Sequence, residues 1–388
     1  MLNCRHRLLN YKLMKVLLTI MLLSLSTMGI AQKKLPSTYD LIIGTYTKGE
    51  SKGMYVYRFY AETGKLAYLN QIEDVSNPSY LTVSANNKFV YAVNENNPNG
   101  SVSAFKFDAG TGKLELINSQ QTGGSPAHVA IDKDQKNVFV SNYGSGSLAV
   151  VPINKDGSLG APTQTIQSEG KSVNAARQAA PHVHSATLSP DEKHLFVADL
   201  GTDKINIYRY RDSKVPALTP ETPAFVSAKP GSGPRHMDFS PDGKFLYVVQ
   251  ELVAAVTVYS VDGAKLTEIQ TISMVDTNYK GKVGAADIHV SPNGKFLYAS
   301  NRGDGDEIVT YEISPVTGQL RFIDRFRTLG ISPRNFIIDP TGKFLIAGNQ
   351  NSNTVNVFAL DQKSGRISPT RNSINIDMPA CLKLVPVE

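Results

Sequence analysis

The chain contains little cysteine, and this limits the covalent chemistry available to it. Its 388 residues include two cysteines, Cys4 near the N-terminus and Cys381 near the C-terminus. Cys4 lies in a leader-like segment described below, so only Cys381 belongs to the folded part and no disulfide can form within it. We expect Cys381 to lie in a strand as a buried small hydrophobic residue.

The chain also lacks a large excess of charge once its first residues are set aside. Its net charge of +6 comes from 40 Lys and Arg against 34 Asp and Glu. Four of the basic residues lie near the N-terminus, at Arg5, Arg7, Lys12 and Lys15, and without them the remainder carries about +2. Nucleic acid is therefore not an expected partner of the folded part.

A long hydrophobic run occurs only at the N-terminus, where it follows those basic residues. The run extends from Val16 to about Leu25 and is followed by Gly29 and Ala31 at positions suited to a signal peptidase. It is shorter than the roughly 20 residues of a membrane span. We predict that residues 1–31 are a signal peptide, that Met14 is an alternative start, and that the mature protein is periplasmic or secreted without a membrane span. If the leader is not functional, the protein is cytoplasmic.

Several common catalytic signatures are also missing. The sequence contains no G-x-S-x-G elbow, no H-E-x-x-H pair and no Cys/His spacing typical of a metal site. Asp304, Asp306 and Glu307 form a small acidic cluster, but they follow Arg302 in an expected surface turn. We therefore predict neither a bound metal nor a cofactor.

A unit of roughly fifty residues recurs along most of the chain. Its core reads SPDGKFLYVVQE from Ser240, SPNGKFLYASNR from Ser291 and DPTGKFLIAGNQ from Asp339. Looser copies begin at Ser84, Asp132 and Ser189. Each copy predicts a hairpin with a Pro-Asp-Gly type of turn, followed by two more strands, and four strands at this period are typical of a propeller blade.

A seventh copy is divided between the two ends of the chain. The segment from Pro379 to Pro386 matches Pro333–Pro340, whereas Leu41–Thr45 matches Leu345–Asn349 without the strand that should precede it. We therefore predict an all-β fold. It is one seven-bladed propeller spanning residues 39–387, with four-stranded antiparallel blades and a ring closed by strands from both termini. The segment 168–180 is an insertion, which we expect to be a surface loop.

Alignment of the copies indicates two positions per blade at one rim of the central channel. Six residues before the turn proline stand Ser79, Ala127, His184, Arg235, Ala286, Arg334 and Ala380, with His128, His236, Asp287 and Asn335 next to some of them. Ten residues after it stand Glu95, Tyr143, Leu200, Glu251, Arg302 and Gln350, with Tyr46 in the divided copy. The framework residues recur while these positions vary and gather His, Arg and Glu. That pattern favours a functional site over ordinary solvated loop ends.

Several of these segments resemble the lactonase family of seven-bladed propellers, which includes the bacterial 6-phosphogluconolactonases and is similar in fold to carboxy-muconate lactonizing enzymes. The resemblance is carried by GSGPRH (231–236), SNRG (300–303), SPRNF (332–336) and GNQ (348–350). It implies a His-Arg-Glu-Arg catalytic set at His184, Arg235, Glu251 and Arg302. His182 competes with His184, because the segment PHVHS offers both.

The expected chemistry is the opening of a lactone by water. Glu251 or His184 would act as the base, and Arg235 and Arg302 would hold the oxyanion or an anionic group of the substrate. Arg334 would be a further anion clamp. The remaining candidates for substrate binding are His182, His236, Asn335, Gln350, Glu95, His128 and Tyr143.

Two alternatives to a lactone hydrolase stay open at this point. The mouth could bind a carbohydrate or an anionic ligand without turnover, or the blades could serve as a protein-interaction scaffold. For a hydrolase we expect a small-molecule partner, an anionic or sugar lactone, and a monomer or a weak dimer. Phosphorylated gluconolactone is a cytosolic intermediate, so export would favour an unphosphorylated sugar lactone or an unrelated compound.

Overall fold

The computed structural model describes residues 35–387. The predicted signal peptide, residues 1–31, lies outside the described residues. From Pro36 onward the chain forms one compact unit. Among the described residues, no helix is long and apolar enough to cross a membrane.

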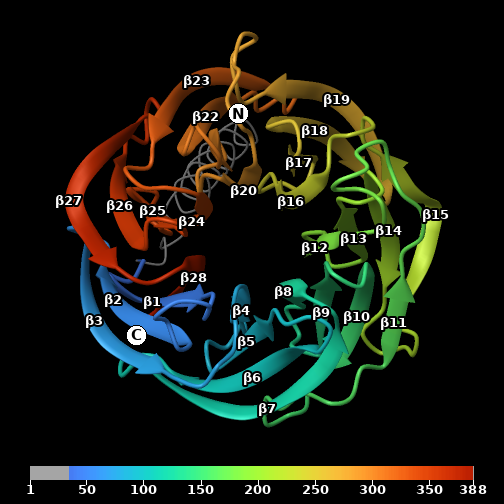
Figure 1. Ribbon diagram of the computed structural model, residues 1–388, viewed down its shortest axis with the longest axis horizontal. Helices are drawn as coiled ribbons and strands as arrows, with labels where there is room; N and C mark the ends of the chain where they lie inside the picture. The colour runs from blue at the N-terminus through green and yellow to red at the C-terminus, as the bar shows by residue number, and fades with distance from the viewer. Residues whose placement is uncertain (1–34, 388) are drawn as a thin grey trace, which may run out of the picture. The chain divides into compact units, whose positions relative to one another are not determined.

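The described chain forms seven four-stranded antiparallel sheets, arranged as the blades of a ring (Figure 1). The first three blades, from inner to outer strand, are β28 (Pro379–Pro386), β1 (Thr38–Thr45), β2 (Met54–Tyr60) and β3 (Lys65–Ile72); β4 (Leu81–Val83), β5 (Phe89–Asn94), β6 (Gly100–Asp108) and β7 (Lys113–Gly123); and β8 (Pro126–Ile131), β9 (Asn137–Asn142), β10 (Ser147–Pro152) and β11 (Gln164–Gln167).

The other four blades follow in chain order around the ring. They are β12 (Val183–Leu188), β13 (His194–Asp199), β14 (Lys204–Tyr210) and β15 (Leu218–Ser227); β16 (Pro234–Phe239), β17 (Phe245–Gln250), β18 (Ala255–Asp262) and β19 (Lys265–Ser273); β20 (Ala285–Val290), β21 (Phe296–Asn301), β22 (Glu307–Ile313) and β23 (Leu320–Arg327); and β24 (Pro333–Ile338), β25 (Phe344–Asn349), β26 (Thr354–Leu360) and β27 (Ile367–Asn375). The predicted propeller is therefore confirmed.

The recurring Ser-Pro-Asp-Gly sequence forms the turn between the two inner strands of a blade. In the turn after β16, the Ser240 hydroxyl donates to Asp242 at 2.7 Å and accepts the Phe245 amide at 3.0 Å. Gly243 follows with a φ of 72°, a conformation that glycine adopts without steric cost. In the copy that begins at Asp339, the carboxylate of Asp339 accepts the Phe344 amide at 2.7 Å in the same way.

The tyrosine of the repeated Lys-Phe-Leu-Tyr sequence connects neighbouring blades. The Tyr247 hydroxyl donates to the carbonyl of Gly318 at 3.1 Å, and Tyr298 donates to Gly365 at 3.0 Å. In each case the acceptor lies in the outer hairpin of the next blade. A buried hydroxyl is thereby satisfied, and each blade is fixed to its neighbour.

The ring closes through the blade that is shared by the two ends of the chain. β28 pairs antiparallel with β1, with Leu41 opposite Leu384 and Gly44 opposite Cys381. The predicted closure is therefore confirmed, and β1 has no unpaired edge. Cys381 is fully buried, and burial raises the pKa of its thiol to about 11, as befits an unreactive residue.

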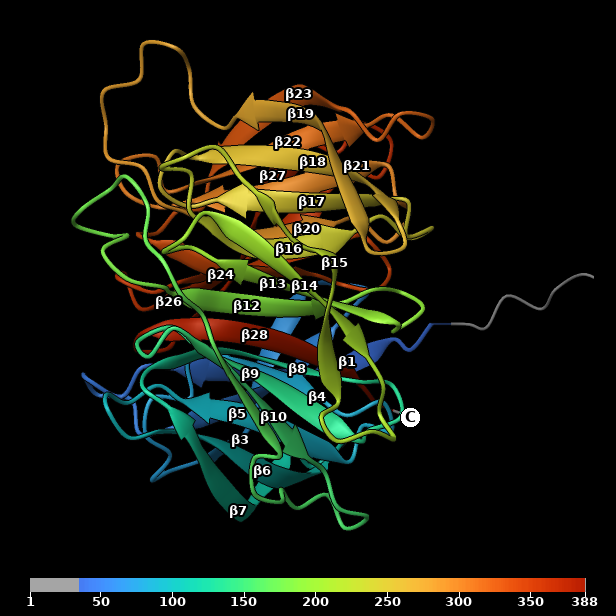
Figure 2. The same cartoon turned by 90° about the vertical axis from the view of Figure 1, so that its right-hand side faces the viewer.

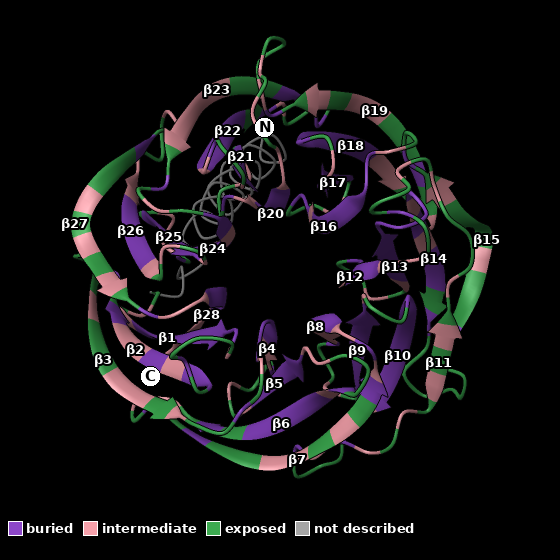
Figure 3. Ribbon diagram, viewed as in Figure 1, coloured by how far each residue is buried: buried purple, intermediate pink, exposed green. Residues whose placement is uncertain are grey.

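Burial decreases from the inner strands to the outer strands (Figure 3). Every residue of β17 is buried, whereas all residues of β19 except Leu266 are exposed or partly buried. Apolar clusters fill the spaces between adjacent blades, as in the cluster that joins Tyr247 to Leu297. The core therefore lies between blades, and the ends of the inner strands are left to line the channel.

Candidate active site at the channel mouth

Bulges near the start of the inner strands set the side chains at one mouth of the channel. In β12, Val183 pairs with Asp199 and Ser185 pairs with Ala198, so His184 has no partner across the ladder. The register also shifts in other inner strands. One residue is skipped at Ala127, Arg334 and Ala380, and two are skipped at Arg235 and His236 and at Ala286 and Asp287. A bulge leaves one residue unpaired and redirects its side chain. These are the first rim positions predicted from the repeat.

The mouth encloses a cavity of about 480 Å³. Its wall is formed by Tyr46, Glu95, Ala127, Tyr143, Arg177, His184, Glu251, Lys282, Val283, Gly284, Arg302, Gly303, Ser332 and Arg334. Four side chains in this wall are cationic and two are carboxylates, so the cavity is suited to an anionic or strongly polar ligand.

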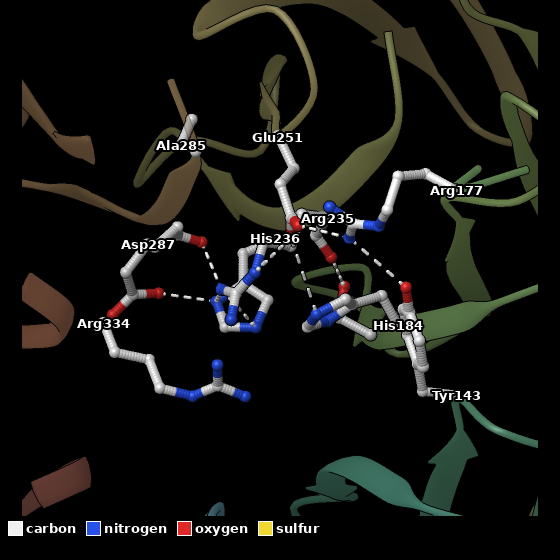
Figure 4. Close-up of polar contacts among 12 residues, drawn as sticks. Tyr143, Arg177, His184, Arg235, His236, Glu251, Ala285, Asp287 and Arg334 are labelled. Atoms are coloured by element: carbon white, nitrogen blue, oxygen red, sulfur yellow. Dashed lines mark hydrogen bonds and ion pairs between the residues drawn. The ribbon is translucent and has the colours of Figure 1, made fainter. Parts of the chain in front are cut away.

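Glu251 is the charged centre of this wall (Figure 4). Its Oε1 lies 2.7 Å from Nη2 of Arg177, and its Oε2 lies 3.0 Å from Nε of Arg235. Nη2 of Arg302 lies 3.3 Å from the same Oε2. Arg302 is itself held in place, because its Nε donates to the carbonyl of Gly284 at 2.9 Å.

The surrounding guanidinium groups keep Glu251 ionised. Burial alone would raise the pKa of this carboxyl, but the three cations outweigh it and lower the pKa to about 2. The cations, in order of effect, are Arg302, Arg235 and Arg177. Such a carboxylate is a weak base and a strong source of negative potential.

His184 faces Glu251 and is held neutral. Its Nε2 lies 4.0 Å from Oε2 of Glu251, and its ring is buried. Burial, followed by the positive charge of Arg235, lowers the pKa of His184 well below its ordinary value. Its Nδ1 has no hydrogen-bond partner among residues 35–387. A neutral imidazole beside a fixed carboxylate can accept a proton, because the carboxylate stabilises the imidazolium that forms.

The neighbouring His182 has a different setting. Its ring stacks on Tyr143 with centroids 4.3 Å apart, and its Nδ1 lies 2.9 Å from the Tyr143 carbonyl. His182 is not part of the cavity wall. Of the two histidines that the sequence left open, His184 is the one that lines the cavity.

The opposite side of the mouth is organised by hydroxyl groups. The Tyr46 hydroxyl donates to Oε2 of Glu95 at 2.7 Å and accepts from Nη2 of Arg334 at 2.6 Å. Ser79 donates to the same oxygen of Glu95. The guanidinium of Arg334 also lies 5.1 Å from the Tyr46 ring centre, which fixes its plane.

The structure corrects the expected position of Arg235. Its side chain lies behind Glu251, is 2% exposed and is outside the cavity wall. Its Nη1 donates to the carbonyl of Ala286. Arg235 can therefore orient and charge-balance Glu251, but it does not face a ligand in the cavity.

Four other residues expected to bind substrate also lie outside the wall. Nδ1 of His236 lies 2.7 Å from Oδ1 of Asp287, and the side-chain amide of Asn335 donates to the same carboxylate. His128 packs its ring against Tyr80 with centroids 4.3 Å apart. All three side chains are buried. Gln350 is likewise absent from the wall.

Two cationic residues of the wall were not found from the sequence. Arg177 belongs to the insertion before β12, and Lys282 belongs to the loop between β19 and β20. Neither occupies a repeat position, so alignment of the copies could not indicate them. The length of segment 168–180 was the one available signal for Arg177.

The described residues contain no group of three or more His, Cys, Asp or Glu side chains arranged to hold a metal. Two of the acidic residues after Arg302 support loop backbones instead. Asp304 accepts the Lys282 amide at 2.8 Å, and Asp306 accepts the Ser332 amide at 2.7 Å. They help to shape the cavity wall.

Comparison with known proteins identifies the family of the chain. Residues 40–384 match the family described as "Lactonase, 7-bladed beta-propeller". The chain belongs to this lactonase family. Two relatives named 6-phosphogluconolactonase cover most of its length. The protein from Bacillus subtilis is 33% identical over 88% of this chain and 97% of its own, and that from Formosa agariphila is 34% identical over 89% and 99%.

A solved structure from the same group is similarly close. The structure titled as a periplasmic gluconolactonase of Pseudomonas aeruginosa is 38% identical, has a TM-score of 0.87, and covers 91% of this chain and 100% of its own. The lactonase fold therefore extends over the whole propeller of this chain.

Proposed function

We propose that this lactonase family member hydrolyses a sugar lactone at the channel mouth. The observation that carries the proposal is the pair formed by His184 and Glu251, a neutral imidazole 4.0 Å from an ionised carboxylate in the wall of a cationic cavity. Two relatives named 6-phosphogluconolactonase, which align with most of this chain, also support the proposal.

The proposed reaction uses His184 as the base. Water attacks the lactone carbonyl carbon while Nε2 of His184 takes its proton, and the carbonyl oxygen becomes an oxyanion. The ring C–O bond then breaks, and the imidazolium returns the proton to the ring oxygen, giving a hydroxy acid. Glu251 stays ionised throughout and stabilises the imidazolium, in keeping with its low pKa.

A guanidinium group in the wall, that of Arg302, stabilises the oxyanion. Arg302 is rigid, because the carbonyls of Gly284 and Ala285 accept from its Nε and Nη2. Its remaining N–H groups can face the cavity, where fixed donors stabilise developing charge without reorganisation. Arg334, held by Tyr46, is placed to bind another oxygen-rich part of the sugar.

The test is turnover by the purified mature protein on a panel of lactones. The panel comprises glucono-δ-lactone, 6-phosphoglucono-δ-lactone and a simple aliphatic lactone, with Glu251→Gln as the matched control. We expect hydrolysis of at least one sugar lactone by the wild type and about 10²-fold less by the variant. Ligand binding without turnover by the wild type would overturn the proposal in favour of a binding propeller.

We further propose that the protein is exported and begins at or near Gln32. The basic and apolar composition of residues 1–31 supports this, as does the periplasmic relative in Pseudomonas aeruginosa. Intact-mass measurement of protein from the cell envelope fraction tests it. A soluble cytoplasmic product that retains residues 1–31 would contradict it.

A further inference from the structure

The loop that precedes β12 has a defined structure of its own. Gln178 is fully buried, and its side-chain amide donates to the carbonyl of Leu200 at 2.8 Å. Its side-chain oxygen accepts the Asn174 amide at 3.1 Å, and its backbone closes a turn onto the same residue. Ser172 anchors the loop further by donating to the carboxylate of Asp203 at 2.5 Å. The segment is therefore fixed to the blade on both sides of Arg177.

This loop holds Arg177 over the cavity. Nη2 of Arg177 lies 2.7 Å from Oε1 of Glu251 and 3.3 Å from the Tyr143 hydroxyl. Figure 4 shows the side chain extending to Glu251 from the side opposite Arg334. In Figure 2, the green loop before β12 and the gold loop before β20 extend from the same side of the propeller.

Arg177 differs from the other two arginines that contact Glu251. Its side chain is 43% exposed, against 2% for Arg235 and 18% for Arg302. Glu251 is already paired with those two less exposed guanidinium groups. A third cation is therefore not needed to balance the carboxylate, and the ion pair of an exposed arginine is weak enough to be exchanged.

Lys282 adds a second exposed cation to the outer part of the same wall. It comes from the loop between β19 and β20, whereas Arg177 comes from the loop between β11 and β12. Neither residue belongs to the repeat that places His184 and Glu251. The outer wall thus carries positive charge beyond what the proposed hydrolysis requires.

We infer that Arg177 is a specificity-determining residue that binds an anionic group, phosphate or carboxylate, carried by the substrate away from its lactone carbonyl. The inference rests on the proposed function and goes further by assigning the outer wall to a distal anion. A guanidinium fits either group through two parallel N–H···O bonds. When the substrate binds, Arg177 releases Glu251 and pairs with the substrate anion. Glu251 keeps its ion pairs with Arg235 and Arg302.

The test compares Arg177→Ala with wild type on 6-phosphoglucono-δ-lactone and glucono-δ-lactone. We expect the KM for the phosphorylated lactone to rise about 10-fold or more, and the preference for it over the neutral lactone to fall by a similar factor. Arg177→Lys should recover part of this preference, since it restores the charge without the paired donors. An equal loss of kcat on both lactones with KM unchanged would overturn the inference and leave Arg177 as a support for Glu251.

Two further variants separate binding from support. Arg209→Ala is the matched control, because Arg209 makes a similar ion pair with Glu221 on an outer strand, 2.7 Å from Nε to Oε1. It should leave the substrate preference unchanged. Gln178→Ala loosens the loop but keeps the guanidinium, and it should reduce the preference less than Arg177→Ala does. A larger effect of Gln178→Ala would contradict a direct contact by Arg177.

Direct binding distinguishes a failure here from a failure of the proposed hydrolysis. Calorimetric titration with 6-phosphogluconate, glucarate and gluconate needs no turnover. Loss of affinity in Arg177→Ala for 6-phosphogluconate alone identifies phosphate as the distal anion, and loss for glucarate identifies carboxylate. An equal affinity of variant and wild type for all three acids would overturn the inference, even if the lactones are hydrolysed.

Discussion

Glu251 and Glu95 occupy the same repeat position on opposite sides of the mouth, but Glu251 is surrounded by arginines and Glu95 by hydroxyl groups. Glu251 lies within 3.3 Å of three guanidinium groups. Glu95 accepts from the hydroxyls of Tyr46 and Ser79, and no ion pair involves it among residues 35–387. The first carboxylate supplies charge next to His184, whereas the second orients Tyr46 and, through it, Arg334. We therefore expect this scaffold position to serve chemistry on one side and binding on the other.

The largest effect is expected on the Glu251 side, from the proposed oxyanion donor. Arg302→Ala should lower kcat/KM by about 10²–10³-fold, as loss of one such donor does in other hydrolases. Steady-state kinetics on the lactone identified by the panel measures this. An activity within a few-fold of wild type in a folded variant would place the oxyanion elsewhere.

His184 should rank next. His184→Asn keeps a polar side chain but removes the base, and kcat should fall about 10²-fold. His182→Asn is the control, because His182 stacks on Tyr143 outside the cavity wall. Equal losses in the two variants would contradict the assignment of His184 as the base.

Variants on the Glu95 side should act mainly on binding. Arg334→Ala should raise KM about 10-fold with a smaller change in kcat, because its guanidinium is held 2.6 Å from the Tyr46 hydroxyl on the Glu95 side and makes no ion pair with Glu251 among the described residues. Tyr46→Phe removes that hydroxyl and should raise KM less. A loss confined to kcat in Arg334→Ala would remove the distinction between the two sides.

The pH profile should give the smallest but most specific signal. His184 must be neutral to act as a base, and burial together with Arg235 holds its pKa well below the ordinary value. As the pH falls from 7, kcat/KM should therefore hold through the usual histidine range near 6.5 and decline only below it. A decline centred at pH 7 or above would show that His184 is not the titrating group.

The sequence predicted the blades because the repeat is local. Ser240, Gly243 and Tyr247 satisfy hydrogen bonds that recur from blade to blade, so their spacing reveals both the turn and the neighbouring blade. The same register located the rim positions of His184, Glu251, Arg302 and Arg334. The divided copy likewise predicted the pairing of β28 with β1.

The same pattern could not predict which rim side chains face the cavity and which are buried behind them. Arg235 and His184 occupy equivalent bulges, yet Arg235 packs behind Glu251 while His184 faces the cavity. That difference depends on which side chains of other blades fill the channel. Arg177 was missed for another reason, because it lies in an insertion that has no counterpart in the other copies.

The most direct measurement is the comparison of Glu251→Gln with Glu95→Gln in single-turnover or steady-state hydrolysis of the same sugar lactone. Both variants replace a carboxyl by an amide at the same repeat position and keep the shape of the side chain. We predict a fall in kcat of about 10²-fold or more for Glu251→Gln. For Glu95→Gln we predict a change of a few-fold, mostly in KM, with both proteins folded. Equal effects of the two substitutions, or a larger effect at Glu95, would contradict this prediction.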